Sequence, residues 1–530
     1  MRHFKIIFEP DGRQISIHSG ATILEAAEQL GIILNTICGG QGTCGKCVVR
    51  IEQSGQEVLA CRYKINSDLT VTIPQTSRFF EQKILEHGAS AKTEFQPDIY
   101  KRYLKFSDEN RIFGVSLDIG TTTIVAKLIN LRDANSIAVE SDYNPQMRYG
   151  DDVISRISYA DDEQKLAELQ RIIIGCVNSL INKLCEKASV SPHDIYELTA
   201  VGNTAMNHIF LGLPVKQLGQ APYNAYSLDA HDLKAEELGI SINPQAVIHT
   251  VENIAGFVGS DTTAAVLAGG MDLAEQISLL IDIGTNGEVV LGTKDKLLCA
   301  SCAAGPAFEG ARISSGSRAI RGAVESVILD DDDIDIDVIG DCSPVSLCGS
   351  GLLDAAAVLL DLGVIDSSGR FIQAQPLRDK LPPKIFRRVI QKDSQPAFVI
   401  AFDKENNEPS VVITQKDIRE LQLAKAAIRT GIYFLMKNLN ISDSDIGQVF
   451  LAGAFGNYLR KDSALRIGLL PKVAPEKIHF IGNAALEGAQ IILRNSLARE
   501  LAGKLARGIK YVEIANQPDF ADVYAGFMFF

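Results

Sequence analysis

The sequence predicts an α/β fold of several domains, and three observations lead to this expectation. The chain has 530 residues, 46% of them hydrophobic and 22% charged, which suits a protein with more than one packed core. Four of its ten cysteines crowd into a glycine-rich segment near the N-terminus. An apolar strand ending in Asp-Ile-Gly-Thr occurs twice, with the two aspartates 164 residues apart. We expect a small domain over residues 1–76, a linker over 77–111 and a large domain over 112–530, with lobes at about 112–275 and 276–530.

The charge and the hydropathy of the sequence argue against some classes of binding partner and some cellular locations. Asp and Glu number 65 against 52 Lys and Arg, and the formal net charge of −13 argues against nucleic acid or an anionic membrane as the main partner. No stretch approaches the roughly 20 uncharged apolar residues of a transmembrane helix. The first ten residues contain an acid and a proline, unlike the apolar region of a secretory signal. We expect a soluble, cytoplasmic protein.

The clustered cysteines predict a metal site. Cys38, Cys44 and Cys47 have the spacing C-x5-C-x2-C, and Cys61 follows after thirteen residues. A disulfide framework would need an oxidising compartment, so metal ligation explains the cluster better. The spacing is close to the C-x4-C-x2-C…C pattern of plant-type ferredoxins, whose thiolates hold a 2Fe–2S cluster. Structural zinc, which usually takes paired knuckles, and four free thiols are the alternatives.

The segments around the cysteines agree with a ferredoxin. Residues 5–10 and 13–17 alternate apolar and polar side chains on either side of Asp-Gly, which predicts a hairpin. Residues 21–32 have helical spacing, and residues 47–53 and 69–74 read as further strands. This order resembles the β-grasp domain of 2Fe–2S ferredoxins, which the N-terminal domain is therefore expected to form.

The duplicated strand and turn predict a phosphate site. Residues 113–123 and 279–288 each place Asp-Ile-Gly-Thr at the end of an apolar strand. A tight glycine turn presents N–H groups and hydroxyls to phosphate oxygens, and an Asp at the strand end can hold a hydrated Mg²⁺. One copy would fit an ordinary turn, but two copies favour loops that bind a polyphosphate from both sides. The expected magnesium residues are Asp118 and Asp282, and the expected phosphate contacts are Gly120, Thr121, Thr122, Thr123, Gly284, Thr285, Asn286 and Gly287.

A third glycine-rich element follows in order. Residues 448–457 read QVFLAGAFGN, an apolar strand into Gly-Ala-Phe-Gly. This resembles the adenosine loop of the actin, sugar-kinase and heat-shock-chaperone ATPases, whose two lobes have a ribonuclease H-like fold. The resemblance implies an ATP site, with Gly453, Ala454 and Gly456 against adenosine. A catalytically inactive scaffold of the same fold is the alternative.

Two further positions are candidates for the same site. In that superfamily the helix before the second phosphate loop carries an acid or amide that orients the attacking group, which makes Asp261 the candidate catalytic residue. Asp261 could also serve as the N-cap of its helix. Gly349, Ser350 and Gly351 are expected at a helix N-terminus, where they could contact an anion or a ribose.

Other segments have simpler interpretations. Residues 200–212 predict a strand that runs into a helix, and residues 302–317 could line the cleft. Cys299 and Cys302 have no second pair nearby and are expected to be core thiols. The acidic run at 329–340 predicts a solvated hairpin rather than a calcium site.

The ordered motifs resemble one family over nearly the whole chain, the reductive activators of corrinoid proteins. The motifs are AVGNTAMNH, AGFVGSDT, IDIGTNGE, AAGPAFEGA, CGSGLLDA and FLAGAFGN, after the four-cysteine domain. The resemblance implies ATP-dependent reduction of a corrinoid protein from Co(II) to Co(I) for methyl transfer, an upstream electron donor and a homodimer formed through the ATPase domain. Known members carry a further middle domain, whereas here the first phosphate loop follows almost directly after the linker, so no middle domain is expected.

Three other functions fit parts of the pattern. An ATP-driven donor to another low-potential metalloprotein would resemble the activators of 2-hydroxyacyl-CoA dehydratases, but these share a cluster across a dimer and lack a separate four-cysteine domain. A small-molecule kinase with an attached redox domain would use Asp261 as its base. An ATP-switched redox sensor would bind partners without turnover.

Overall fold

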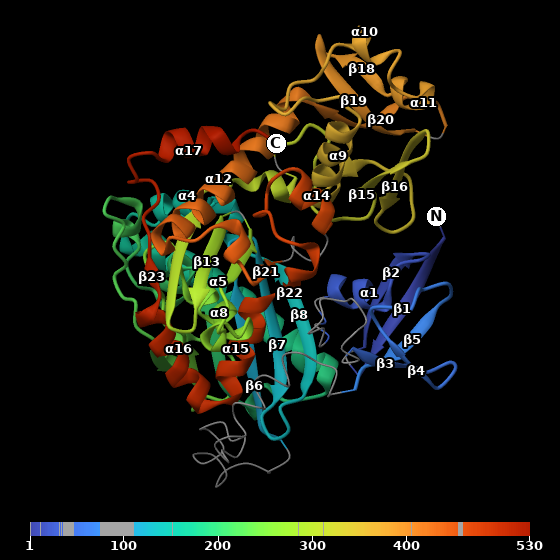
Figure 1. Cartoon of the computed structure of the whole chain (residues 1–530). Helices are drawn as coiled ribbons and strands as arrows, with labels where there is room; N and C mark the ends of the chain where they lie inside the picture. The colour runs from blue at the N-terminus through green and yellow to red at the C-terminus, as the bar shows by residue number, and fades with distance from the viewer. Residues whose placement is uncertain are drawn as a thin grey trace.

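Five β-sheets and the helices around them organise the described part of the chain in this computed structural model (Figure 1). The residues that the structure describes are 2–10, 12–30, 32, 34, 47–74, 111–150, 152–284, 286–310, 312–403, 405–453 and 459–530. Nearly all of the predicted linker therefore lies outside the described residues. No helix in these ranges combines the length and the apolar character needed to cross a membrane.

The N-terminal domain is a five-stranded sheet with one helix packed on it. Its strands have the order β2-β1-β5-β3-β4, and the central pair, β1 and β5, is parallel. Alternate side chains such as Ile6, Phe8, Val49 and Val71 are fully buried against the helix, because successive residues of a strand face opposite sides of the sheet. The predicted hairpin, helix and β-grasp domain are confirmed. The elements are β1 (His3–Glu9), β2 (Arg13–His18), α1 (Ile23–Gln29), β3 (Val48–Ile51), β4 (Gln56–Leu59) and β5 (Leu69–Thr72).

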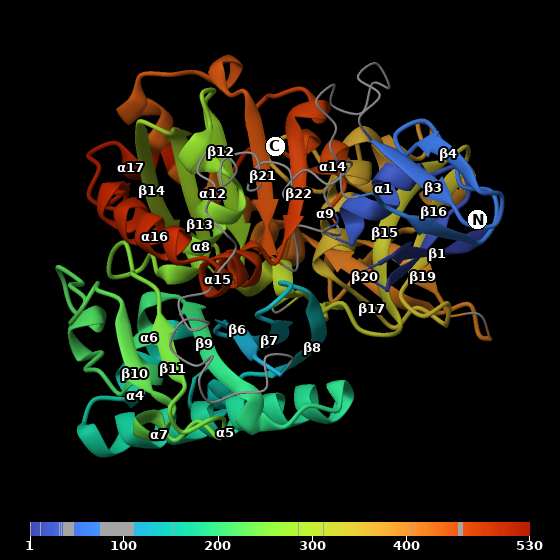
Figure 2. The same cartoon turned by 90° about the horizontal axis from the view of Figure 1, so that it is seen from below.

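The first lobe of the large domain is a six-stranded sheet with the order β10-β11-β9-β6-β7-β8. Strand β6 is almost wholly buried, and its large apolar side chains alternate with the small or polar residues Gly114, Ser116 and Asp118. Helix α5 covers one face with apolar side chains at helical spacing, among them Leu169, Val177 and Leu184 (Figure 2). The strands are β6 (Phe113–Ile119), β7 (Thr123–Asn130), β8 (Ser136–Tyr143), β9 (Ile195–Gly202), β10 (His231–Lys234) and β11 (Val247–Thr250). The helices are α4 (Val153–Tyr159), α5 (Glu163–Ala188), α6 (Thr204–Leu211) and α7 (Ala235–Leu238).

The second lobe has the order β22-β21-β12-β13-β14-β23 and repeats five strands of this topology, while its sixth strand, β23, lies at the opposite edge from β10 of the first lobe. In each lobe an antiparallel meander begins with the strand that ends in Asp-Ile-Gly-Thr, and parallel strands extend the sheet on its other side. The duplicated motif therefore marks a duplicated fold, and the predicted two-lobed actin-like architecture is confirmed. The strands are β12 (Ser278–Ile283), β13 (Gly287–Thr293), β14 (Lys296–Cys302), β21 (Gln448–Ala452), β22 (Ile478–Gly482) and β23 (Lys510–Tyr511).

Two helices lie between the lobe sheets, α8 (Ser260–Ala268) and α15 (Ala484–Arg494) (Figure 2). They approach so closely that a Cβ on Gly488 would lie 2.1 Å from the carbonyl oxygen of Ala264. Only glycine fits at that position. Helix α15 also packs on β6 and β9 of the first lobe, and α16 (Ser496–Gly508) packs on α8.

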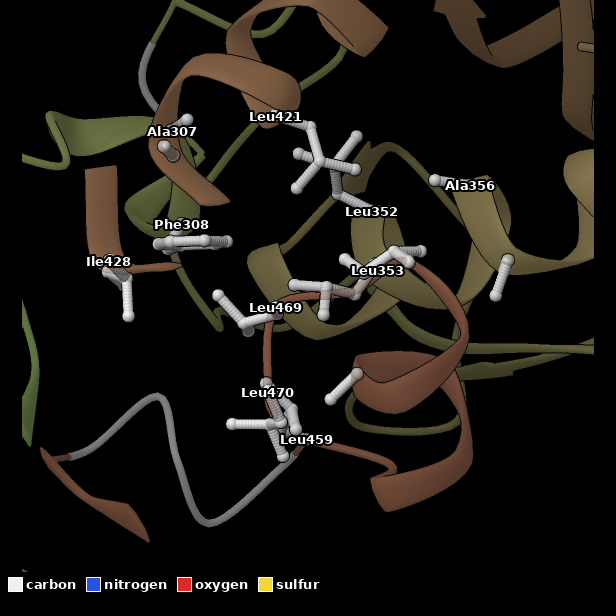
Figure 3. Close-up of a cluster of buried hydrophobic side chains, with 14 of the residues drawn as sticks. Ala307, Phe308, Leu352, Leu353, Ala356, Leu421, Ile428, Leu459, Leu469 and Leu470 are labelled. Carbon is white, nitrogen blue, oxygen red and sulfur yellow. The ribbon is translucent and has the colours of Figure 1, made fainter. Parts of the chain in front are cut away.

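Two three-stranded sheets extend from the second lobe, with the orders β16-β15-β17 and β18-β19-β20. The acidic run forms the turn and second strand of the β15–β16 hairpin, as predicted. Figure 3 shows Leu352 and Leu353 of α9, Leu421 and Ile428 of α12, and Phe308 in one buried cluster that joins this extension to the lobe. The elements are β15 (Ala323–Asp330), β16 (Asp333–Val338), β17 (Ser346–Leu347), α9 (Gly349–Asp361), α10 (Ala374–Leu377), α11 (Pro383–Phe386), β18 (Val389–Lys392), β19 (Gln395–Phe402), β20 (Pro409–Thr414), α12 (Gln415–Leu439), α14 (Lys461–Arg466) and α17 (Phe520–Phe527).

Candidate functional site

The two predicted phosphate turns lie at the ends of corresponding strands. Asp118 is near the end of β6 and Asp282 near the end of β12. The N–H of Gly120 donates to the carbonyl oxygen of Thr123 at 3.0 Å and closes the first turn. A Cβ on Gly120 would lie 2.6 Å from that oxygen, which excludes any other residue in this geometry. The second turn is closed by the N–H of Gly284, which donates to Asn286 at 3.0 Å, while Thr285 lies outside the described residues.

Four carboxyl groups near the two turns influence one another's pKa. Burial raises the pKa of Asp118 to about 7; the hydrogen bond from Asn483 opposes this shift, and repulsion from Asp261 and Asp282 adds to it. Burial, with repulsion from Asp261, raises the pKa of Asp282 to about 7, and burial raises the pKa of Asp261 to about 6. Burial and the charges of Asp261 and Asp282 raise the pKa of Glu288 on β13 well above its usual value. A cation at this point would relieve the repulsion among these groups.

The donor set at this point fits magnesium. Carboxylate oxygens are the protein ligands that Mg²⁺ prefers, and the ion usually keeps several of its waters. Within the described ranges, no three His, Cys, Asp or Glu side chains lie close enough to ligate one ion together. A site of dispersed carboxylates suits a hydrated ion shared with phosphates better than a fully dehydrated one.

Asp261 lies in the first turn of α8 and is half-buried. Its Oδ1 accepts from the backbone N–H of Thr262 at 2.7 Å. The N-cap of the helix is Gly259, so the expectation that Asp261 is the N-cap is wrong. The helix begins earlier because Ser260 already has helical geometry, with its hydroxyl bonded to the carbonyl of Gly202 at 3.1 Å. Asp261 therefore stays available to the cleft, and its catalytic role stays a prediction.

Side chains distant in sequence hold the first turn in place. Asn203 donates to the hydroxyl of Thr121 at 3.0 Å while its own oxygen caps α6. Asn144 donates to the carbonyl of Gly120 at 2.9 Å, and the fully buried Arg156 donates to the carbonyl of Thr121 at 2.6 Å. Sequence reasoning identified the strand-to-helix turn of residues 200–212 but missed Asn144 and Arg156, which carry no local motif.

Contacts between the lobes also reach the first turn. Asn483, the N-cap of α15, donates from Nδ2 to Asp118 Oδ2 at 2.8 Å. The hydroxyl of Thr122 donates to Glu309 at 3.4 Å, which brings the segment 302–317 to the cleft. Arg318 lies 3.9 Å from Glu309 and over the ring of Tyr143 at 5.1 Å. The first turn is therefore hydrogen-bonded to residues of the second lobe.

The adenosine residues are described only in part. Gly453 directly follows β21 and has φ +87°, and a Cβ there would lie 2.7 Å from Asp282 Oδ1. Gly453 thus allows this loop to approach the second phosphate turn. Ala454 and Gly456 lie outside the described residues.

The predicted ribose contact at α9 gains no support from the hydrogen bonds. Ser350 donates its hydroxyl to the carbonyl of Glu325 at 2.8 Å. A Cβ on Gly351 would lie 2.4 Å from the carbonyl of Val324. Gly349, which begins the helix, and these two residues pack on β15, and a role toward nucleotide stays a prediction.

Two of the four clustered cysteines are described, and they lie together. Cys47 Sγ and Cys61 Sγ are 3.3 Å apart without a disulfide. Two sulfurs at that distance can bind one tetrahedrally coordinated metal ion, so the donor set fits an iron–sulfur cluster. Cys38 and Cys44 lie outside the described residues. Cys299 and Cys302 are fully buried on β14, which confirms them as core thiols.

Family models match three consecutive parts of the chain. Residues 6–66 match a 2Fe-2S iron-sulfur cluster binding domain. Residues 113–274 match the RACo middle region, and residues 276–530 match the C-terminal domain of RACo, the ASKHA domain. The expectation that a middle domain is missing is therefore wrong. The middle region is the first lobe itself. Because this lobe begins with a predicted phosphate turn, its motifs assign it wholly to the ATPase domain.

Relatives and one solved structure match nearly the whole chain. The corrinoid activation enzyme RamQ from Eubacterium limosum is 33% identical over 98% of this chain and 98% of its own. A reductase of the methylated amine-specific corrinoid protein in its Co(II) form, from Methanosarcina barkeri, is 25% identical over 77% of this chain and 73% of its own. A solved reductive activator for a corrinoid iron-sulfur protein matches with a TM-score of 0.72 and 30% identity, over 99% of this chain and 98% of that one. The chain belongs to the family of reductive activators of corrinoid proteins.

Proposed function

We propose that this protein uses ATP to drive the one-electron reduction of a corrinoid protein from Co(II) to Co(I), the state that a methyltransferase system requires. One observation carries the proposal: a single chain joins a paired-thiol site to a two-lobed cleft of four carboxyl groups, and it shares this organisation over its whole length with named corrinoid activators. The chain is thus an enzyme that couples an ATPase to electron transfer.

The N-terminal domain accepts the electron and transfers it to the corrinoid protein. Cys38, Cys44, Cys47 and Cys61 would hold a 2Fe–2S cluster, which supplies one electron when it has been reduced by an upstream donor. One electron leaves this domain for each Co(II) that becomes Co(I), and the donor replaces it. Plant-type clusters lie near about −400 mV, and we expect the cobalt couple to be lower still. Each additional 100 mV costs about 2.3 kcal/mol, so the transfer needs a source of free energy.

The cleft handles the nucleotide. Asp118 and Asp282 would hold Mg²⁺, and the backbone N–H groups and hydroxyls of the two turns would bind the phosphates. Asp261 would orient the attacking water or accept its proton. Gly453 leaves space for the adenosine loop beside Asp282.

The two lobes couple these events. Thr122 bonds to Glu309 across the cleft, and Asn483 bonds to Asp118 from the opposite lobe. A nucleotide that binds between the turns changes the balance between open and closed lobes only if it binds one of them more tightly. We expect the closed form to bind the corrinoid partner and to favour the cobalt coordination from which reduction is easier.

The test is a visible spectrum. The reduced protein is mixed without oxygen with a Co(II) corrinoid protein, with and without Mg²⁺ and ATP, and the Co(I) band is followed. We expect the band only with nucleotide, and we expect Asp282→Ala to keep the cluster absorbance while losing the ATP dependence. Failure of the wild-type protein to form Co(I) with nucleotide would overturn the proposal. A phosphorylated small molecule formed without corrinoid would instead favour a kinase.

Three further properties belong to this proposal. The family resemblance supports a homodimer formed through the large domain, which light scattering of the purified protein tests. A cytoplasmic location is expected from the corrinoid partner and the upstream electron donor. The electron donor is expected to be a low-potential redox protein, because the N-terminal domain must be reduced before it can pass an electron on.

A further inference from the structure

The N-terminal domain meets the large domain along α15 and its neighbours. Arg13 on β2 lies 3.9 Å from Glu487 on α15, and His3 on β1 lies 3.0 Å from Asp337 on β16, both measured between the charged or ring nitrogen and the carboxylate oxygen. Helix α1 packs beside β22, the strand that leads into α15 (Figures 1 and 2). In both contacts a carboxylate of the large domain faces a side-chain nitrogen of the small domain.

Helix α15 carries the Glu487 contact and, at its N-cap, the contact from Asn483 to the first lobe. Asn483 and Glu487 are four residues apart, a spacing that places side chains on the same side of a helix. Asn483 holds Asp118 in the nucleotide cleft at 2.8 Å. Glu487 pairs with the buried Lys127 of β7, which also donates to Gln490 at 2.9 Å. Because Lys127 is buried, the position of Glu487 is fixed relative to the first lobe.

We propose that α15 links the nucleotide site to the docking of the iron–sulfur domain, with Asn483 positioning Asp118 at one end and Glu487 holding Arg13 one turn later. This inference rests on the proposed function, since it takes the cleft to bind nucleotide and the small domain to hold the cluster. Docking and nucleotide binding then strengthen each other.

The sign of the coupling follows from the contacts that occur together. Asn483 donates to Oδ2 of Asp118, which leaves the other carboxylate oxygen for the metal–nucleotide. The same position of α15 brings Glu487 to Arg13. A contact that stabilises this position of the helix must favour both partners, and linkage requires that each changes the affinity of the other by the same factor.

The solvent exposure of the Arg13 and Glu487 side chains limits how strongly docking and nucleotide binding are coupled. The side chains of Arg13 and Glu487 are 40% and 42% exposed, and ion pairs of this kind contribute little in water. We expect a factor of about two to five in affinity. A contact this weak lets the small domain leave its docking surface and reach an acceptor.

Nucleotide affinity in the full-length protein tests the link. A fluorescent ADP analogue is titrated with Mg²⁺ into Arg13→Ala and into Arg50→Ala, a matched control whose neighbour Glu52 lies in the same domain. Arg13→Ala should bind about two- to fivefold more weakly and Arg50→Ala should bind like the wild type. In a Glu487→Gln background Arg13→Ala should have no further effect. If Arg13→Ala changes the cluster absorbance, Asp337→Asn replaces it, because Asp337 is remote from the cysteine loop in sequence and should weaken binding in the same direction.

Hydrogen exchange supplies the reverse measurement. Mg²⁺ with ADP should slow exchange of the amides of α1 in the wild-type protein and should not do so in Asn483→Ala. The link is wrong if Arg13→Ala and Asp337→Asn bind nucleotide as tightly as Arg50→Ala does. It is also wrong if Mg²⁺ with ADP protects the amides of α1 equally in Asn483→Ala and in the wild-type protein. If wild-type protein still reduces a corrinoid protein with ATP in that case, only the link fails. If wild-type protein binds neither iron nor nucleotide, the proposed function fails first.

Discussion

Asp282 and Glu288 lie directly opposite each other in the antiparallel pair of β12 and β13. Side chains at such positions project from the same face of a sheet, so two carboxyl groups point into the same end of the cleft. Neither has a cationic partner in the hydrogen bonds and ion pairs of the described residues. This pairing makes Glu288 a further candidate for cation binding beside Asp282.

Replacing Glu288 should weaken magnesium binding. Glu288→Gln removes one negative charge next to Asp282, and the loss of a favourable interaction of about 1 kcal/mol corresponds to about fivefold in affinity. The measurement is the Mg²⁺ dependence of nucleotide binding, with the exposed Glu500→Gln on α16 as the control. An unchanged Mg²⁺ requirement in Glu288→Gln would remove Glu288 from the site.

Without Mg²⁺, the free energy of unfolding should fall as the pH rises toward the pKa of Asp282. The pKa of Asp282 is about 7 in the folded protein against a usual 3.8, because burial disfavours its charge. The folded state therefore binds the proton more tightly, and the stability this contributes is present below pH 4 and lost between about pH 4 and 7.

Asp282→Asn should accordingly increase the free energy of unfolding at pH 8 by about 1–3 kcal/mol and change it little at pH 4. Urea unfolding with a chelator measures this, and the exposed Asp379→Asn serves as the control. Adding Mg²⁺ should shrink the difference at pH 8. An equal effect of Asp282→Asn at both pH values would contradict the electrostatic account.

Cluster assembly should depend on Cys61 and not on a cysteine elsewhere. Cys61 and Cys342 are both partly exposed, but only Cys61 lies beside another cysteine sulfur, that of Cys47, among the residues the structure describes. Cys61→Ala should lose the visible absorbance and the electron transfer and should keep nucleotide affinity within about threefold, whereas Cys342→Ala should keep all three. Loss of nucleotide binding in Cys61→Ala would contradict the independence of the two sites.

Adding a single methyl group at Gly453 should weaken nucleotide binding. Its positive φ and the 2.7 Å that would separate an added Cβ from Asp282 Oδ1 leave no room for a side chain. Gly363 has a similar φ of +66° and no described atom within 4 Å of an added Cβ, so Gly363→Ala isolates the backbone strain. Gly363→Ala should cost about 1 kcal/mol of stability through backbone strain alone, Gly453→Ala should cost more because of the added contact, and only Gly453→Ala should also weaken nucleotide binding by about tenfold. Equal nucleotide affinities in the two variants would place the adenosine loop elsewhere.

Local patterns were sufficient for the main elements of the site. Asp118 and Asp282 could be found because a buried strand, an acid and a glycine turn occur within a few residues and then occur again. The cysteines could be found because metal ligands in a small loop must be close in sequence. The two lobes followed from the repeat, and their matching strand orders confirm it.

Contacts that depend on tertiary packing could not be found in this way. Asn144 and Arg156 reach the first turn from 24 and 35 residues away, and nothing in their own neighbourhoods requires it. Asn483 is 365 residues from Asp118, yet the sequence around Asn483 contains a pattern that could have identified it. Both Asn203 and Asn483 follow a strand that ends in glycine, cap the next helix and donate to the first turn.

The missed middle region has a similar cause. Residues 113–274 begin with a phosphate turn, so the sequence motif assigned them to the ATPase domain. In the fold they form a complete sheet with its own core and helices, a unit that a family can treat separately. A motif identifies what touches the nucleotide and does not fix where one structural unit ends.

The close approach of Gly488 to Ala264 limits how the lobes can move. Since backbone meets backbone there, the two helices cannot separate without opening a void along their whole length, and no side chain is present at Gly488 to fill it. Opening and closing must then be a rotation about this seam. Segments near such an axis shift little while the sheet margins swing through a wider arc, so a small angular change at the phosphates becomes a larger translation at the rim.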